Sequence, residues 1–188
     1  MTLQELSISG AYVAVHKVFP DERGLFREWF KAEEVGLIDK GFSVKQANYS
    51  KSKQSVIRGI HYSLAPEGQA KLLTCASGRA VDVLVDLRIG SPTYLHVEYV
   101  ELSEDSGKVI FIPTGVGHGF IVESESAAVV YLTSSGYAPD YEKAISPMDP
   151  ELGINWPIPA GETGVISKAD TEAPTLAEAR EKGSLPTF

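Results

Sequence analysis

Hydrophobic and polar side chains alternate along most of the chain between about residues 10 and 135. A period of two is typical of β-strands, because successive side chains point to opposite faces of a sheet. The pattern predicts strands in segments 11–19, 26–30, 44–49, 55–62, 70–75, 79–87, 95–102, 108–112, 119–122 and 127–133. Pro20 and Asp21 are expected to end the first of these, and turn pairs such as Ser77-Gly78 separate others.

Eight or more short strands at a spacing of about 8–12 residues indicate an all-β sandwich or barrel. Helical signals are few: residues 31–34 suit a short helix, and residues 176–182 read as a clear one that ends at Gly183. Between the last predicted strand and the C-terminal helix, the proline-rich segment 137–175 is expected to form an irregular but packed extension. The apolar segment 11–19 is expected to form a sheet edge, and pairing with another chain would protect such an edge from aggregation.

One predicted strand, residues 79–87, carries two carboxylates on one face. Asp82 and Asp86 share the side of Leu84, while the intervening valines point the other way, into the core. The alternation leaves two interpretations of the charged face. It either meets solvent, or it lines the interior of a barrel and helps support a polar site.

Composition bounds the class of protein. The 188 residues have a formal net charge of −8 and a sequence pI near 5.0, so the protein has no general attraction for nucleic acid or anionic membranes. An anionic ligand would need a local cluster of Arg and Lys. The single cysteine, Cys75, excludes an intramolecular disulfide and is expected to be a buried, inert thiol. The N-terminus resembles no signal peptide, and no apolar run approaches the roughly 20 residues that span a bilayer, so we expect a cytoplasmic protein.

The four histidines, His16, His61, His96 and His118, form no close pair of the kind that metal-binding jelly rolls use. The sequence also lacks the glycine-rich motifs of dinucleotide and phosphate sites and the GxSxG nucleophile motif. We therefore expect neither a metal nor a redox cofactor. What remains is a set of polar residues inside strand-like segments, where apolar or small residues would be usual. Arg58 and His61 are three apart, so alternation puts them on opposite faces unless Gly59 marks a bend or bulge.

Nine short motifs, in order along the chain, closely resemble the dTDP-4-dehydrorhamnose 3,5-epimerase family. The match runs from about residue 3 to 186, and it is the order of the motifs that makes it specific. They are Asp21-Glu-Arg-Gly-Leu-Phe-Arg-Glu28, Gln46-Ala-Asn-Tyr-Ser50, Arg58-Gly-Ile-His61, Gln69-Ala-Lys71, Asp82-Val-Leu-Val-Asp86-Leu-Arg88, Gly90-Ser-Pro-Thr-Tyr94, Gly117-His-Gly-Phe120, Tyr131 with Tyr137-Ala-Pro and Glu142, and Asp149-Pro with Trp156-Pro157.

The resemblance implies a cupin-type jelly-roll barrel that forms a homodimer and acts on dTDP-4-dehydro-6-deoxy-D-glucose. It implies one epimerase domain over residues 1–188, with the jelly-roll core at about 10–135 and the extension at about 136–188. The 4-keto group of that sugar acidifies the protons on C3 and C5. Inversion needs a base on one face of the sugar, an acid on the other and stabilisation of the enolate between them.

By the same resemblance, His61 is the base and Asp170 orients its imidazole. Lys71 faces the developing enolate oxygen, and Tyr131 returns a proton from the opposite face. The implied substrate-binding residues are Arg23, Phe26, Glu28, Gln46, Asn48, Arg58, His118, Tyr137, Glu142 and Lys168, with Tyr137 stacking on thymine. The chain departs from the family pattern at Ala169, where a lysine is common; Lys168 is the neighbouring candidate.

Three alternatives stay open, the last of which is a metal-dependent cupin oxygenase that stoichiometric iron or manganese in the purified protein would support. The loop 62–68 resembles that of antibiotic-sugar relatives, some of which invert one carbon, so a single-centre 3- or 5-epimerase is the first. A non-enzymatic jelly-roll sugar-binding module is the second. It would need the aromatic and arginine residues, but it has no use for His61, Lys71 and Tyr131 together.

Overall fold

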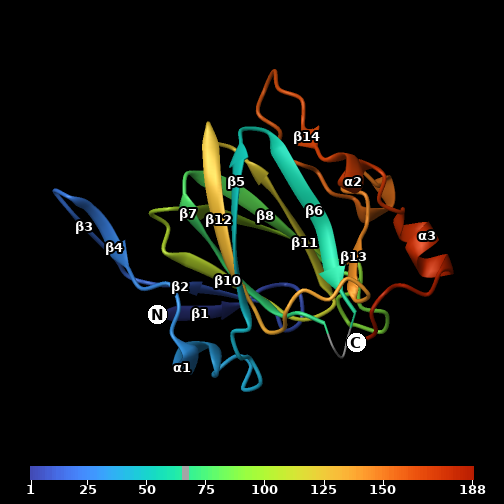
Figure 1. The fold of residues 1–188 in the computed structure, drawn as a ribbon, viewed down its shortest axis with the longest axis horizontal. Helices are drawn as coiled ribbons and strands as arrows, with labels where there is room; N and C mark the ends of the chain where they lie inside the picture. The colour runs from blue at the N-terminus through green and yellow to red at the C-terminus, as the bar shows by residue number, and fades with distance from the viewer. Residues whose placement is uncertain (65–67) are drawn as a thin grey trace.

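The computed structural model describes residues 1–64 and 68–188. It has two facing antiparallel sheets, a projecting hairpin, and a C-terminal extension packed against one sheet (Figure 1). The first sheet has the order β1-β2-β10-β7-β12-β5: Thr2–Glu5, Tyr12–Val15, Lys108–Ile112, Lys71–Ser77, Ser126–Thr133 and Gln46–Lys53. The all-β class predicted from the alternation is confirmed, and so is the jelly-roll-like arrangement implied by the family resemblance.

The second sheet has the order β13-β6-β11-β8-β9, with bounds Glu142–Ala144, Val56–Ser63, Val116–Val122, Arg79–Asp86 and Val97–Ser103. The short β14 (Val165–Ile166) pairs with β6 in parallel. Every other pairing between strands is antiparallel within the described residues. The site-bearing strands β6 and β11 thus lie in one sheet, and β5, β7 and β12 lie in the other.

The main core lies between the two sheets. Leu73, Ile110 and Val129 from the first sheet meet Leu84 and Phe120 from the second. Part of the outer face of each sheet is covered as well. Val81, Val83 and Val85 pack with Trp156 and Leu176 of the extension, so they are buried beneath it and away from the barrel interior. Both faces of β8 are therefore buried, and Asp82, on the side of Leu84, is fully enclosed. The barrel-interior interpretation of that strand is correct.

The N-terminal prediction needs correction. Segment 11–19 is divided between β2 and β3 (Val18–Asp21), and β2 lies inside the first sheet between β1 and β10. The edge is β1, whose four residues are all exposed and so carry no burial pattern that the sequence could reveal. Pro20 lies within β3, which ends at Asp21 and pairs with β4 (Gly24–Arg27) in a two-stranded hairpin, where an unpaired edge tolerates proline.

The extension is built from short elements that share buried polar contacts. They are η1 (Pro150–Leu152), α2 (Lys168–Thr171) and α3 (Leu176–Glu181), while α1 (Ala32–Val35) lies in the N-terminal half. Asp149 caps η1 and also accepts a hydrogen bond from the first amide of α3, Leu176 N, at 2.6 Å. Thr175 and Glu178 form a capping box on α3. In the part of the chain that the structure describes, no helix is long and apolar enough to cross a membrane.

Candidate active site

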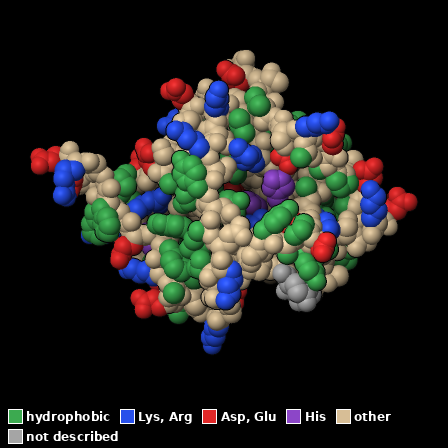
Figure 2. Space-filling view, in the orientation of Figure 1, with side chains coloured by type: hydrophobic (Ala, Val, Ile, Leu, Met, Phe, Trp, Pro, Cys, Tyr) green, Lys and Arg blue, Asp and Glu red, His purple; other side chains and the backbone are tan. Residues whose placement is uncertain are grey.

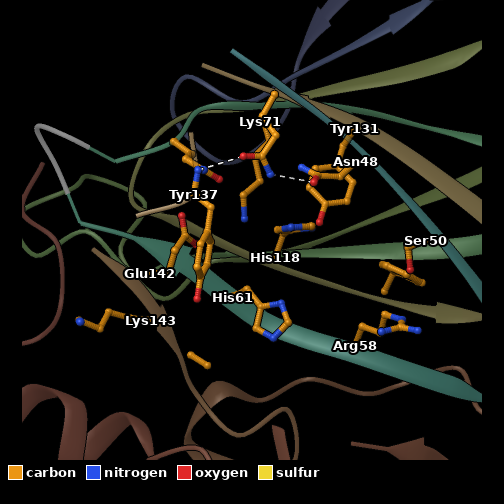
Figure 3. A pocket seen from close by; sticks show the side chains of 14 residues that line it. Asn48, Ser50, Arg58, His61, Lys71, His118, Tyr131, Tyr137, Glu142 and Lys143 are labelled. Carbon is orange, nitrogen blue, oxygen red and sulfur yellow. Dashed lines mark hydrogen bonds between the residues drawn. The ribbon is translucent and has the colours of Figure 1, made fainter. Parts of the chain in front are cut away.

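A pocket of about 460 Å³ opens between the two sheets. Figure 2 shows this face of the molecule hollowed near its centre, with histidine side chains in the hollow among basic and hydrophobic ones. Strands of both sheets contribute to the walls (Figure 3). The lining residues are Gln46, Asn48, Ser50, Arg58, His61, Gln69, Lys71, His118, Phe120, Tyr131, Tyr137, Glu142, Lys143 and Ala144.

A register shift brings Arg58 and His61 to the same side of β6. His118 of β11 pairs with His61, but Phe120 pairs with Arg58, so one extra residue of β6 is accommodated between them. Gly59 lies at this point with φ +115, a backbone conformation that favours glycine. A Cβ there would lie 2.5 Å from the Cα of Gly119. The bulge considered from the sequence is present, and it explains how both side chains line the pocket.

The extension supplies a carboxylate to His61. Asp170 of α2 is almost fully buried, and its Oδ1 lies 2.7 Å from Nε2 of His61. The backbone amide of Asp170 donates to Oγ of Ser167, the N-cap of that helix, so the position of the carboxylate is set by local structure. A carboxylate bound to one imidazole nitrogen fixes the tautomer and leaves the other nitrogen as an acceptor, as a general base requires.

Lys71, on β7 in the opposite sheet, is buried at the pocket wall. Burial lowers the pKa of its ammonium group, and the nearby carboxyl groups of Glu142 and Asp82 oppose that shift. Burial also raises the pKa of Glu142, against the attraction of Lys71 and His61. An enclosed cation surrounded by few fixed partners is suited to stabilise negative charge that appears on a ligand oxygen.

Tyr131 faces the pocket from β12, across from His61 of β6. Burial raises the pKa of its phenol and Glu142 adds to the shift, while Arg58 opposes it. The phenol is therefore protonated at neutral pH and is placed to act as an acid. Base and acid candidates thus come from opposite sheets, with the pocket between them (Figure 3).

Polar side chains near Tyr137 form a chain of hydrogen bonds at the pocket mouth. Oε1 of Gln46 accepts from the Tyr137 amide at 3.0 Å, and Nε2 of Gln46 donates to Oδ1 of Asn48 at 2.8 Å. The ring of Tyr137 is 70% exposed, so one of its faces is available for stacking. Across the pocket, Nε of Arg58 donates a hydrogen bond to Oγ of Ser52. This bond does not use the two terminal nitrogens of the guanidinium group, which can donate to a ligand.

Four residues predicted to bind substrate do not line this pocket. Arg23 and Phe26 lie on the β3-β4 hairpin, which projects away from the sheets; the Arg23 side chain is 85% exposed and pairs with Asp21 (Figure 1). Glu28 follows the hairpin and pairs with Lys31 at 2.7 Å. Lys168 lies on the same helix as Asp170, but its exposed side chain is directed to Glu172 at 3.7 Å.

The predictions from sequence missed several lining residues: Ser50, Gln69, Phe120, Lys143 and Ala144. Ser50 shares the face of Gln46 and Asn48 by its i, i+2 spacing, and this signal could have identified it. Lys143 and Ala144 belong to β13, a three-residue strand without a usable pattern.

Of the loop 62–68, residues 65–67 lie outside the described residues. Within residues 1–64 and 68–188, no group of three or more His, Cys, Asp or Glu side chains is arranged to hold a metal ion.

Comparisons with known proteins agree on one family. The family model described as dTDP-4-dehydrorhamnose 3,5-epimerase matches residues 5–178. A dTDP-4-dehydrorhamnose 3,5-epimerase of Streptomyces griseus is 41% identical, covering 99% of this chain and 92% of its own. The crystal structure of a 4-keto-6-deoxy sugar epimerase from the novobiocin cluster of Streptomyces spheroides has a TM-score of 0.94 at 41% identity, covering 100% and 94% of the two chains. A 3'-monoepimerase from Streptomyces bikiniensis, in complex with dTDP-quinovose, has a TM-score of 0.89 at 41% identity, covering 97% and 91%.

Proposed function

The chain belongs to the dTDP-4-dehydrorhamnose 3,5-epimerase family, and we propose that it inverts C3 and C5 of dTDP-4-dehydro-6-deoxy-D-glucose to give dTDP-4-dehydro-L-rhamnose. The protein is an isomerase by this membership, and the step belongs to dTDP-L-rhamnose biosynthesis. Its chemistry is general acid–base catalysis on the carbons next to a ketone.

One observation carries the proposal: His61 and Tyr131 face one pocket from opposite sheets. Packed sheets are about 10 Å apart, which leaves room for a flat sugar ring between side chains of opposite walls. An inversion requires that a proton leave from one face of the ring and return to the other. A pocket that only bound a sugar would gain nothing from a base and an acid in that arrangement.

In the proposed reaction, His61 removes the proton from C3 or C5 with the nitrogen that does not contact Asp170. The electron pair of the broken C–H bond forms the enolate, and the charge moves to the oxygen on C4. Lys71 stabilises that oxygen as the charge develops. Tyr131 then donates its phenolic proton to the opposite face of the same carbon, and solvent restores the protonation of both residues.

The remaining pocket residues are proposed to hold the nucleotide and the sugar hydroxyls. Tyr137 offers an exposed ring for thymine, and Arg58 offers a planar set of donors for the diphosphate. The proposed binding set also includes Gln46, Asn48, His118 and Glu142.

We propose that the protein is a cytoplasmic homodimer and that its β3-β4 hairpin reaches the ligand of a second copy. Arg23 and Phe26 cannot contact a ligand in the pocket of their own chain, because the hairpin points away from it (Figure 1). Phe19 and Phe26 form an exposed aromatic pair on the hairpin, the kind of apolar surface that another protein covers. A second copy of this chain would cover the aromatic surface, and the ligand in its pocket would lie within reach of Arg23 and Phe26.

The function is tested by proton NMR of dTDP-4-dehydro-6-deoxy-D-glucose with the purified protein in deuterium oxide. We expect the signals of both the C3 and C5 protons to disappear, and His61→Ala to abolish the loss. His96→Ala is the matched control, since His96 is an exposed histidine outside the pocket. In Tyr131→Phe, His61 can return a deuteron to the face it came from, so we expect exchange without inversion. Full exchange in His61→Ala would refute the assignment of the base.

The single-centre epimerase remains the alternative, because one relative of 41% identity is described as a 3'-monoepimerase. Exchange confined to one carbon in the same NMR experiment would establish it. No exchange at either carbon, with ligand still bound, would favour the non-enzymatic sugar-binding module. A second measurement, coupling to a reductase that forms dTDP-L-rhamnose, would separate double inversion from exchange with retention.

A further inference from the structure

At the wall of the pocket, His118 forms a buried pair with Asp82, a residue to which the proposed reaction gives no role. Asp82 lies on β8 and its side chain is fully enclosed; His118 lies on the neighbouring strand β11 and is almost fully enclosed. Nδ1 of His118 is 3.5 Å from Oδ2 of Asp82. Since Nδ1 faces Asp82, Nε2 is the ring nitrogen available to a ligand in the pocket that His118 lines (Figure 3).

The surroundings of Asp82 do not suit a carboxylate. Among the described residues, neither of its two oxygens has a hydrogen-bond partner within the usual limits, and neither has Nδ1 of His118. An ionised carboxylate can only accept hydrogen bonds. If it is buried without donors, nothing offsets most of the free-energy cost of removing it from water. A protonated carboxyl group, in contrast, needs one acceptor, and Nδ1 of His118 is the acceptor within reach.

A second aspartate on the same face of the same strand provides the contrast. Asp86 accepts hydrogen bonds from Nε and Nη2 of Arg88, each at 2.8 Å, and from the hydroxyl groups of Ser91 and Thr93. Burial opposes its ionisation, but these donors together lower the pKa of Asp86. Burial raises the pKa of Asp82 well above its ordinary value, and the charge of Lys71 opposes this rise. The two carboxyl groups thus lie in opposite environments.

Burial keeps the imidazole of His118 neutral. It is the largest cause of a pKa well below the ordinary value for histidine, and the nearby side chains of Lys71 and His61 add to it. The titratable and charged groups that line the pocket beside His118 come mainly from four further strands. They are Arg58 and His61 on β6, Lys71 on β7, Tyr131 on β12, and Glu142 and Lys143 on β13, with Tyr137 from the segment before β13. Lys71 favours the ionised form of Asp82, but its effect on the pKa is smaller than that of burial, which favours the protonated form.

We propose that Asp82 is a positioning residue whose carboxyl group is protonated and donates to Nδ1 of His118, so that His118 directs Nε2–H into the pocket. His118 is then a neutral donor aimed at a sugar oxygen beside Lys71, and it can share the stabilisation of the enolate without carrying a charge itself. This use of the donor rests on the proposed function, but the protonation state and the tautomer do not.

The distance of 3.5 Å is at the outer limit for an N···O hydrogen bond. Hydrogen bonds of a catalytic site are often long in the absence of ligand and shorten when it binds. Among the described residues no other protein group competes for Nδ1, so a small rotation of either side chain completes the contact.

The first test needs no substrate. Nitrogen chemical shifts of the histidine rings, measured by NMR on ¹⁵N-labelled ligand-free protein, distinguish the two neutral tautomers from the imidazolium, and His118→Gln identifies the signal. We expect a neutral ring with the proton on Nε2 throughout the neutral pH range. A neutral ring with the proton on Nδ1, or a doubly protonated ring, would overturn the proposal.

The second test compares two substitutions of Asp82 in the deuterium-exchange experiment. Asp82→Asn keeps a donor for Nδ1 without a charge, whereas Asp82→Leu removes it. We expect the Asn variant to exchange about 10–100-fold faster than the Leu variant, as for other residues that orient a functional group. If the Asn variant loses as much activity as the Leu variant, Asp82 acts as a carboxylate; if neither loses activity, it positions nothing. Both outcomes contradict the proposal.

Asp86→Asn is the matched control for folding. Because Asp86 accepts from charged and hydroxyl donors, an amide there should lower the melting temperature, while Asp82→Asn should not. If Asp82→Leu fails to fold, the melting temperature of Asp82→Asn and the tautomer of the wild-type protein still decide the question. If the wild-type protein exchanges no proton of the dTDP-sugar, the proposed function fails while the tautomer remains measurable.

Discussion

At the scale of single residues, the site contains two pairs in which an aspartate sets the tautomer of a histidine. Asp170 contacts Nε2 of His61, and Asp82 faces Nδ1 of His118. His61 and His118 are also paired residues of adjacent strands. Two histidines side by side therefore have different partners on different ring nitrogens, and this difference suits one to accept a proton and the other to donate a hydrogen bond.

We expect Asp170→Asn to lower the rate of His61-dependent exchange by about 10²-fold or more, since an amide can hold the imidazole in the wrong tautomer. The rate of exchange in deuterium oxide checks this. Glu172→Gln is the control at the C-cap of the same short helix, because the Glu172 side chain is exposed and its ion pair within the described residues is with Lys168. An Asp170→Asn protein that is as active as the control would show that His61 needs no carboxylate.

A second prediction concerns the buried cation. Lys71→Met preserves much of the length of the side chain and removes its charge, so we expect the exchange rate to fall by about 10²–10³-fold. Folding should not suffer, because an enclosed charge is replaced by an apolar group of similar volume. Exchange kinetics and thermal melting separate the two effects. Lys53→Met, at an exposed position of β5, should change neither; a fast Lys71→Met enzyme would remove Lys71 from the mechanism.

At the scale of elements, the site depends on one irregularity in an otherwise regular sheet. Without the extra residue between Arg58 and His61, strict alternation would direct one of them out of the pocket. Gly59 makes the irregularity possible, because its backbone conformation and its contact with Gly119 both exclude a side chain. The second element-scale feature is α2, four residues long, which brings Asp170 against β6.

We expect Gly59→Ala to destabilise the fold by about 1–3 kcal/mol beyond the cost of a positive φ alone, because the new Cβ meets backbone atoms of Gly119 and His118. Gly90→Ala is a suitable control: φ is +89 there, but nothing lies within 4 Å of the added atom. Denaturant unfolding of both variants isolates the steric part. Equal losses in the two variants would show that β6 and β11 can separate without cost.

At the scale of the whole molecule, the predicted site is incomplete within one chain. The pocket has its base, acid and cation, but Arg23 and Phe26 lie on a hairpin that points elsewhere. The proposed homodimer resolves this by letting each hairpin serve the other subunit, a reciprocal contact typical of two-fold symmetric dimers.

Complementation tests that arrangement. We expect a hairpin variant, Arg23→Ala with Phe26→Ala, and His61→Ala each to be inactive alone. After co-refolding, random pairing should restore roughly a quarter of wild-type activity, because half of the dimers then hold one complete site. Placing all three substitutions on one chain and pairing it with wild type provides the control, in which mixed dimers should be inactive. Active mixed dimers in the control, or a monomeric mass in light scattering, would contradict the proposal.

The sequence alone was sufficient for most of the longer strands and for many of the residues that line the pocket. Alternation located those strands to within a few residues because burial between two layers imposes a period of two, but it gave no signal for the short strands β1, β13 and β14. Gln46, Asn48, Arg58, His61, Lys71, His118, Tyr131, Tyr137 and Glu142 were named from short motifs, and all line one pocket. Such motifs carry this information because polar groups inside a strand pattern have no reason to be there unless they face a polar cavity.

The tertiary structure decided what depends on contacts far apart in the chain. The 2.7 Å contact between His61 and Asp170 joins residues 109 apart in sequence, and no local pattern encodes it. Whether Asp82 faced solvent or the barrel interior also stayed open, because alternation separates the two faces of a strand without saying what covers them. The second layer and the extension cover both faces of β8, and that burial, a property of the assembled fold, gives Asp82 and Asp86 their opposite environments.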